Sequence, residues 1–142
     1  LHDALPILFC KMTDDEIKSG ARIVSMNEKF VAFCPFAPRY AFETWILPRR
    51  HESSFERSSD SETISLAETL KSVLTKMKRT LNDPPYNMML HTSPFGENLD
   101  GIYHWHIEIA PCLNTIAGFE RGTDFYINPT PPESAAEYLR KA

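Results

Sequence analysis

Tyr103-His104-Trp105-His106-Ile107-Glu108-Ile109 is the stretch of sequence that decides the fold and marks a candidate site. Apolar and polar side chains alternate along it, and a period of two is typical of a β-strand with one buried face. We therefore expect one face to join the core, with Trp105, Ile107 and Ile109. The opposite face would carry His104, His106 and Glu108.

Two histidines that are two residues apart on a strand can act on one ligand. Their Cα atoms lie roughly 6.5 to 7 Å apart, so His104 and His106 could lean toward one metal ion or one phosphate group. His91 precedes them on what should be the neighbouring strand and could supply a third nitrogen. Zinc and iron bind neutral imidazole well, so we predict a metal site with one open coordination position. Glu108 could orient one of the rings through a hydrogen bond.

Two other interpretations of these histidines stay open. They could be hydrogen-bonded residues without any ligand. Alternatively, His106 could be catalytic, because an imidazole can attack phosphorus and form a covalent nucleotidyl intermediate. That chemistry needs donors for the phosphate oxygens, and no glycine- or serine-rich cradle surrounds the pair, so metal binding is favoured.

The composition is that of a globular protein with a single domain. The chain has 142 residues and a net charge of -4, and 42% of its residues are hydrophobic. This length and hydrophobic content are enough for one sizeable core. A basic surface is lacking, which argues against nucleic acid as a partner. No apolar run reaches the length of a membrane span, so no membrane partner is expected either. The three cysteines form no C-x-x-C pair, which favours reduced thiols and a cytoplasmic location.

The order of the predicted elements indicates an α+β fold. We expect strands over residues 22–26, 30–36, 42–48, 86–92 and 103–109, and short helices over 14–20 and 133–142. Ser59 and Glu62 form a capping box that opens one long helix, which ends at Asn82. Strands and helices do not alternate regularly, so the sheet should be antiparallel with its helices on one side. Residues 1–7 would be an irregular start and residues 8–142 the domain.

A basic cluster, Arg49-Arg50-His51, follows the strand predicted over 42–48. Two guanidinium groups and an imidazole could hold a phosphate through charge-assisted hydrogen bonds. The cluster could equally be a solvated strand end, and the sequence alone leaves these two alternatives open.

Several motifs together resemble the C-terminal half of galactose-1-phosphate uridylyltransferases, a family within the histidine-triad superfamily. They are Phe30-Val31-Ala32-Phe33-Cys34-Pro35-Phe36-Ala37, Phe42-Glu43-Thr44-Trp45-Ile46-Leu47-Pro48-Arg49-Arg50-His51, Asp83-Pro84-Pro85-Tyr86-Asn87, His104-Trp105-His106 and Ala117-Gly118-Phe119-Glu120. The resemblance runs from about residue 8 to the end of the chain. It implies a histidine-triad-like antiparallel sheet with one long helix and a short C-terminal helix.

The resemblance also implies roles for individual residues. His91, His104 and His106 would bind a structural zinc or iron ion, together with a glutamate from an N-terminal half. Phe119 and Glu120 would contact the hexose, in some members across a dimer interface, and Asn128 would touch the substrate phosphate. By internal symmetry, His106 occupies the position that the nucleophile has in the other half.

The activity implied is transfer of uridylyl from UDP-glucose to galactose 1-phosphate, in galactose metabolism, by a dimer. The family's nucleophile lies in a His-Pro-His-x-Gln motif, which this sequence lacks, so the chain resembles half an enzyme. A related branch acts on ADP-glucose as an adenylyltransferase or phosphorylase, and residues 117–123 and 126–129 resemble it at least as well. Two further hypotheses are a self-contained histidine-triad nucleotide hydrolase that uses His106, and a non-catalytic, metal-stabilised binding module.

Overall fold

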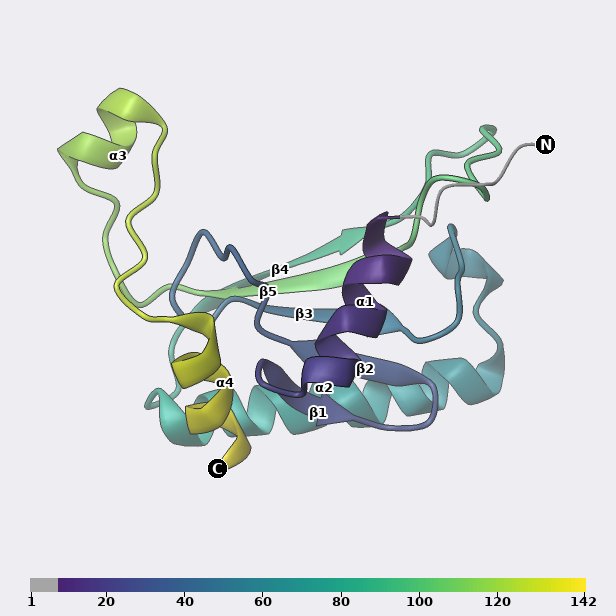
Figure 1. Cartoon of the computed structure of the whole chain (residues 1–142), viewed down its shortest axis with the longest axis horizontal. Coiled ribbons are helices and arrows are strands. Elements are labelled where there is room, and N and C mark those ends of the chain that lie inside the picture. Colours follow the sequence, from purple (N-terminus) through teal and green to yellow (C-terminus); the bar gives the residue numbers. More distant parts are fainter. Residues whose placement is uncertain (1–7) are drawn as a thin grey trace.

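The computed structural model describes residues 8–142, and the irregular start that we predicted for residues 1–7 lies outside them. Its centre is one antiparallel sheet of five strands in the order β1-β2-β3-β5-β4 (Figure 1). The predicted α+β fold is confirmed. In chain order the elements are α1 (Leu8–Ser19), β1 (Ile23–Met26), β2 (Phe30–Phe33), β3 (Thr44–Pro48), the 3-10 turn η1 (Phe55–Arg57), α2 (Asp60–Thr80), β4 (Tyr86–His91), β5 (His106–Pro111), α3 (Gly118–Thr123) and α4 (Pro132–Arg140).

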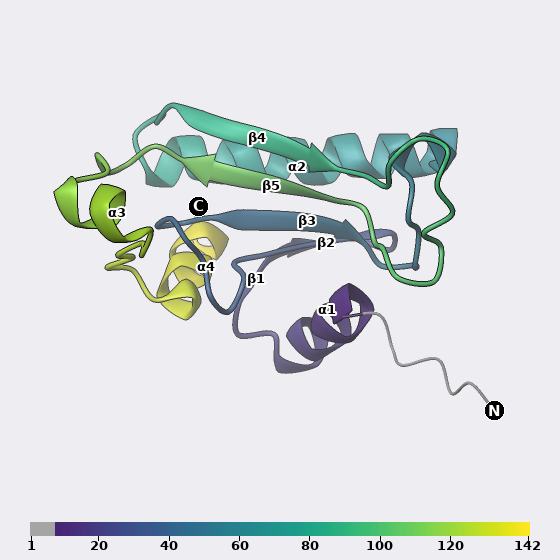
Figure 2. The ribbon, with the colours of Figure 1, turned by 90° about the horizontal axis from the view of Figure 1, so that it is seen from above.

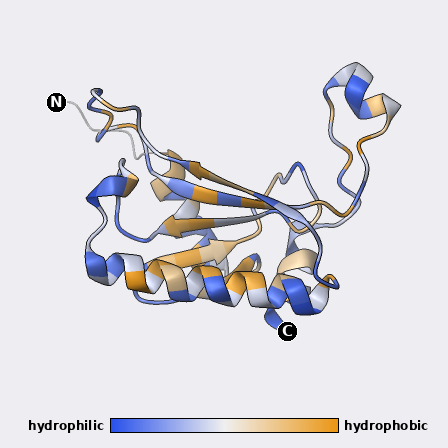
Figure 3. Ribbon diagram, turned by 180° about the vertical axis from the view of Figure 1, so that it is seen from behind, coloured by the Kyte–Doolittle hydropathy of each residue, from blue (hydrophilic) through white to orange (hydrophobic). Residues whose placement is uncertain are grey.

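The long helix α2 begins at the predicted capping box. The Ser59 hydroxyl accepts from the backbone N–H of Glu62, and the Glu62 carboxylate accepts from the backbone N–H of Ser59. Hydrophilic and hydrophobic residues alternate along the helix (Figure 3), and its apolar residues Leu66, Val73 and Met77 are buried. An amphipathic helix of this kind is stabilised mainly by burial of its apolar side.

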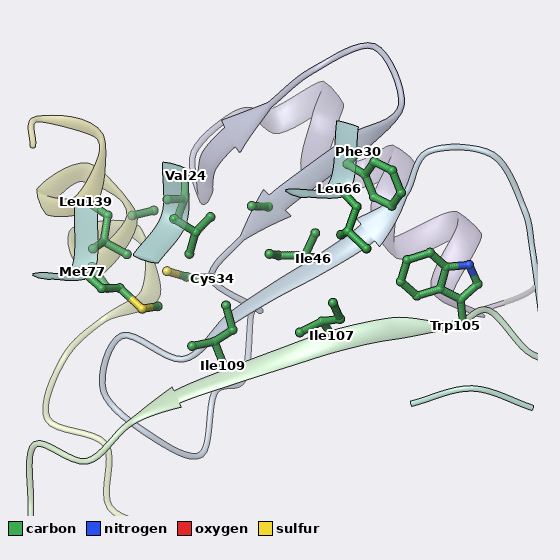
Figure 4. Close-up of a cluster of buried hydrophobic side chains, with 14 residues drawn as sticks. Val24, Phe30, Cys34, Ile46, Leu66, Met77, Trp105, Ile107, Ile109 and Leu139 are labelled. Carbon is green, nitrogen blue, oxygen red and sulfur yellow. The ribbon is translucent and has the colours of Figure 1, made fainter. Parts of the chain in front are cut away.

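The larger part of the core lies between the sheet, α2 and α4 (Figure 4). The apolar face of the histidine stretch enters it as predicted, with Trp105, Ile107 and Ile109 all buried. The strand β5 itself begins only at His106. The backbone N–H of Trp105 instead donates to the carbonyl of Glu52, 2.9 Å away, so His104 and Trp105 lie in a segment that leads into the strand.

Helix α1 packs on the opposite face of the sheet, so the prediction that all helices share one side is wrong (Figure 2). Its apolar residues Phe9, Met12 and Ile17 surround the buried trio Val31, Phe33 and Leu47. The helix also starts at Leu8 rather than at residue 14. The acidic pair after residue 13 predicts a start there, but Phe9 and Met12 also pack against the sheet and the helix extends back to include them.

Between β5 and α4 the chain forms an arm, residues 113–128, that stands away from the sheet and contains α3 (Figure 1). Its large apolar side chains are exposed, including Phe119 at 56% and Phe125 at 71%. The sequence had not predicted this short helix. In the described part of the chain, no helix combines the length and the hydropathy needed to cross a membrane.

Candidate metal centre

Two groups of potential metal ligands lie close together near the start of β5. Cys10, His51 and His104 form the cysteine–histidine group, and His91, His106 and Glu108 form the strand group. Within each group, one ligand atom per residue lies within 4.8 Å of the others. The structure therefore brings His91 and His106 together as predicted, but it places His104 with two other residues.

In the cysteine–histidine group, the two imidazoles point the same kind of nitrogen at the thiol. The Nδ1 atoms of His104 and His51 lie 3.3 Å and 3.4 Å from the Cys10 Sγ. The Nε2 atom of His104 lies 2.9 Å from the Pro48 carbonyl oxygen, and the Nε2 atom of His51 lies 2.6 Å from that of Asp100. A carbonyl oxygen only accepts, so each Nε2 carries a hydrogen, and in the neutral form of each ring Nδ1 presents a lone pair to the sulfur.

A single thiol cannot satisfy both rings, because it has one proton and two lone pairs face it. Three converging donors with fixed outer nitrogens are instead the arrangement of a metal site. In tetrahedral zinc the bond lengths of about 2.3 Å to sulfur and 2.0 Å to nitrogen separate the two ligand atoms by roughly 3.5 Å. The two sulfur–nitrogen distances observed here are close to that value, so the spacing of Cys10 from each imidazole suits zinc.

Burial shifts the pKa of two of these donors, His104 and Cys10. The His104 side chain is 1% exposed, and the loss of hydration lowers the pKa of its imidazole to about 4. His104 is therefore neutral at pH 7, which is the form that binds metals. Burial, and then the nearby charge of Asp14, raise the pKa of the Cys10 thiol, so metal binding there would have to displace a proton.

The strand group is built by the register of β4 and β5, which sets His91 opposite His106. Their rings stack with centroids 4.6 Å apart. The carboxylate of Glu108 lies between them and solvent-exposed Arg39: its oxygens are 3.5 Å from the His91 Nε2, 3.6 Å from the His106 Nε2 and 3.4 Å from the guanidinium. The buried His91 Nε2 has no hydrogen-bond partner, which leaves it available to a ligand.

His106 is enclosed on several sides. Its ring stacks on Phe9 of α1 at 4.7 Å and on Trp45 of β3 at 5.3 Å, and the residue is 3% exposed. Its Nδ1 lies 3.1 Å from the His104 carbonyl oxygen, so Nε2 carries the lone pair. Burial lowers the pKa of the His106 imidazole. A phosphate approaching that nitrogen would meet the carboxylate of Glu108, which is an unfavourable setting for nucleophilic attack on phosphorus.

The separation of His104 from His106 has a local cause. Strand β5 begins at His106, so the alternation of faces does not constrain the ring of His104. The carbonyl of Pro48, at the end of β3, directs that ring instead. Cys10 was missed as a ligand, because nothing in the sequence connects a residue in α1 with a histidine 94 positions later.

The basic cluster at residues 49–51 is divided by the fold. Arg49 donates to the carbonyls of Asn27 and Glu28, and Arg50 pairs with the carboxylates of Glu52 and Glu62. Both guanidinium groups are thus engaged by the protein's own oxygens. The third member, His51, belongs to the cysteine–histidine group.

The three residues predicted to bind the substrate all lie on the arm. Glu120 helps to line a cavity of about 300 Å³ that also reaches Arg39, Tyr40 and Asn87. Phe119 is exposed on α3 and is not among the residues that line this cavity. The Asn128 amide donates to the Tyr40 carbonyl at 3.2 Å and accepts from the Thr130 N–H at 2.9 Å.

Comparison with known proteins adds to this geometry. Residues 2–128 match the family described as "Galactose-1-phosphate uridyl transferase, C-terminal domain". The chain is 42% identical over 128 residues to an ADP-glucose phosphorylase of Arabidopsis thaliana, covering 89% of this chain and 36% of the relative. It is 34% identical over 140 residues to a galactose-1-phosphate uridylyltransferase of Thermotoga maritima, covering 93% and 43% respectively.

Solved structures agree with these sequence matches. An ADP-glucose phosphorylase from Arabidopsis thaliana with bound ADP-glucose superposes with a TM-score of 0.84 and 40% identity, covering 92% of this chain and 43% of that one. A Hit-like protein from Bartonella henselae, 17% identical, has the same fold with a TM-score of 0.68 and covers 96% and 95% of the two chains. The chain spans less than half the length of the Arabidopsis phosphorylase and the Thermotoga uridylyltransferase. It belongs to the family of galactose-1-phosphate uridyl transferase C-terminal domains.

Proposed function

We propose that this chain is the C-terminal half of a cytoplasmic nucleotidylyltransferase that acts on a nucleotide sugar and a hexose 1-phosphate. It would contribute a structural metal site and part of the sugar pocket to the enzyme. An N-terminal half-domain, or a second subunit of a dimer, would supply the nucleophile. Family membership over residues 2–128 is the observation that carries this proposal.

The main candidate reaction is uridylyl transfer between UDP-glucose and galactose 1-phosphate. The family's description names the uridyl transfer and galactose 1-phosphate. The second candidate is ADP-glucose phosphorolysis. The higher identity to the Arabidopsis ADP-glucose phosphorylase, 42% against 34% for the Thermotoga uridylyltransferase, favours it. In both, Glu120 would contribute to the sugar pocket from the cavity beside the arm, with Phe119 and Asn128 as the other predicted contacts.

The enclosure of His106 supports a half-enzyme without a nucleophile of its own. A nucleophilic imidazole needs an open path to phosphorus, whereas this ring is stacked on Phe9 and Trp45. The chain incubated with UDP-glucose and galactose 1-phosphate, or with ADP-glucose and phosphate, should give no turnover. A phosphoramidate on His106, detected by intact mass after incubation with a nucleotide sugar, would instead establish the self-contained enzyme.

For the metal, we propose that Cys10, His51 and His104 hold a zinc or iron ion. When bound, the ion would act structurally, because its ligands come from α1, the segment after β3 and the segment before β5, and it would link these three parts of the chain. Water or a partner residue would complete the coordination. The predicted ligands His91 and His106, with Glu108, form the alternative site for this ion.

Metal analysis of purified variants tests this assignment. Cys10→Ser should lose the bound metal and melt at a lower temperature, since serine is a poor ligand for zinc. Cys112→Ser is the matched control, because Cys112 is exposed and belongs to neither ligand group. If Cys10→Ser keeps its full metal content while His91→Ala loses it, the strand group is the site. Stabilisation by metal but not by any nucleotide sugar would favour a non-catalytic binding module.

A further inference from the structure

Asp100 lies beside the cysteine–histidine group and makes separate hydrogen bonds through its backbone carbonyl and its carboxylate. Its carbonyl oxygen accepts the hydrogen bond from the His51 Nε2, at 2.6 Å. Its carboxylate accepts from the Ser53 hydroxyl at 2.5 Å and from the Arg57 guanidinium at 2.6 Å. Asp100 therefore joins the loop before β5 to the segment that carries His51.

The two histidines of this group are held in different ways. His104 is buried, and its acceptor is the carbonyl of Pro48, which belongs to the sheet. His51 is exposed, and its acceptor lies in a loop outside the sheet and the helices. The His51 ring makes an edge contact with the His104 ring, at 5.4 Å between centroids, but it is not enclosed. Its orientation therefore depends more on the hydrogen bond to Asp100 than that of His104 depends on the bond to Pro48.

We propose that Asp100 is a positioning residue for His51. By anchoring its own carbonyl through Ser53 and Arg57, it holds the imidazole in the tautomer that carries the hydrogen on Nε2 and turns the Nδ1 lone pair toward Cys10. The inference rests on the proposed metal site for its functional meaning. The tautomer itself is a property of the metal-free protein.

A substitution cannot remove the backbone carbonyl of Asp100, but it can remove the carboxylate that holds this carbonyl in place. Asp100→Ala removes the carboxylate that Ser53 and Arg57 hold, so the loop should loosen and His51 should lose its fixed acceptor. Outer-shell partners of metal-bound histidines typically change metal affinity by about 10- to 100-fold. Because the carbonyl itself remains, we expect the lower end of this range, about a tenfold loss of zinc affinity.

Asp100→Asn is the conservative variant. An amide oxygen can still accept from the Ser53 hydroxyl, while the attraction to the Arg57 guanidinium is weakened. Its zinc affinity should fall between those of the native chain and Asp100→Ala. Glu137→Ala is the matched control, since it also removes one carboxylate from an ion pair, with Lys141, but lies in α4.

The experiment has two readouts on the native chain and these three variants. The first is zinc affinity by competition with a chromogenic chelator. The second is the tautomer of His51 in the metal-free protein, from long-range proton–nitrogen correlation spectra. We expect the native chain and Glu137→Ala to show the Nε2–H form of His51, and Asp100→Ala to show a mixture of tautomers. Thermal unfolding of the metal-free variants checks that the fold is kept.

The outcomes separate this inference from the proposed metal site. If Asp100→Ala binds zinc as tightly as the native chain and keeps the Nε2–H tautomer, the positioning role is refuted while the metal site stands. If the native chain binds no zinc, the metal site fails. A tautomer change confined to the Asp100 variants would then still support the inference, and an unchanged tautomer would overturn it as well.

Discussion

The protonation of His104 should make the metal-free fold unstable in mild acid. Its imidazole has an ordinary pKa near 6.5, and burial lowers this to about 4 in the folded chain. Between these two values the unfolded chain takes up a proton that the folded chain does not. The stabilisation is therefore complete above pH 6.5 and is lost as the pH falls toward 4.

The size of the effect follows from that interval. At about 1.4 kcal/mol per pH unit, the fall from 6.5 to about 4 corresponds to a loss of roughly 3 kcal/mol. That is a large part of the total stability of about 5–15 kcal/mol that is usual for a domain. Urea unfolding of the chelator-treated chain, at half-unit steps from pH 7 to pH 4, measures it directly.

A titration-free variant isolates His104 from the other ionisable groups. His104→Gln keeps an N–H that can donate to the Pro48 carbonyl but has no proton to gain in this range. The difference in unfolding free energy between the native chain and the variant should shrink steadily as the pH falls from 6.5 to 4. If the two stabilities fall in parallel, the buried neutral imidazole is not the cause and the reasoning is refuted.

Three further outcomes are expected. Glu62→Gln should destabilise the fold at pH 7, because Arg50 and the cap at Ser59 hold the pKa of the Glu62 carboxyl at about 2. That stabilisation is present above pH 4.5 and is lost as the pH falls toward 2, so the denaturation midpoints of the native chain and the variant should converge in acid; a constant difference between them would contradict the assignment. Ile109→Ala should lower the free energy of unfolding by about 2–5 kcal/mol, since Ile109 is fully buried in the core, whereas Ile64→Ala, at a side chain that is 62% exposed, should change it by less than about 1 kcal/mol; equal effects in chemical denaturation would count against the described core. Removal of metal by a chelator should lower the melting temperature of the native chain and leave Cys10→Ser unchanged, and calorimetry that shows the same shift for both would place the ion elsewhere.

Much of the fold could be read from local patterns. The alternation through Trp105, Ile107 and Ile109 predicted the buried face of β5, and the capping box at Ser59 predicted where α2 begins. Such patterns succeed because the burial of a strand face or a helix stripe depends on residues that are close in sequence. Helix α1 was placed too late and on the wrong side of the sheet, because its partners in β2 and β3 are distant along the chain.

The sequence by itself determined that three histidines lie on or beside one strand, and that the chain resembles one half of a known family. Only the tertiary structure decided how those histidines are grouped. It separated His104 from His106 by turning one ring to the Pro48 carbonyl, and it brought Cys10 from a helix on the other end of the chain to meet it. Convergence of ligands depends on the positions and rotamers of residues tens of positions apart, and no periodicity along the chain encodes those.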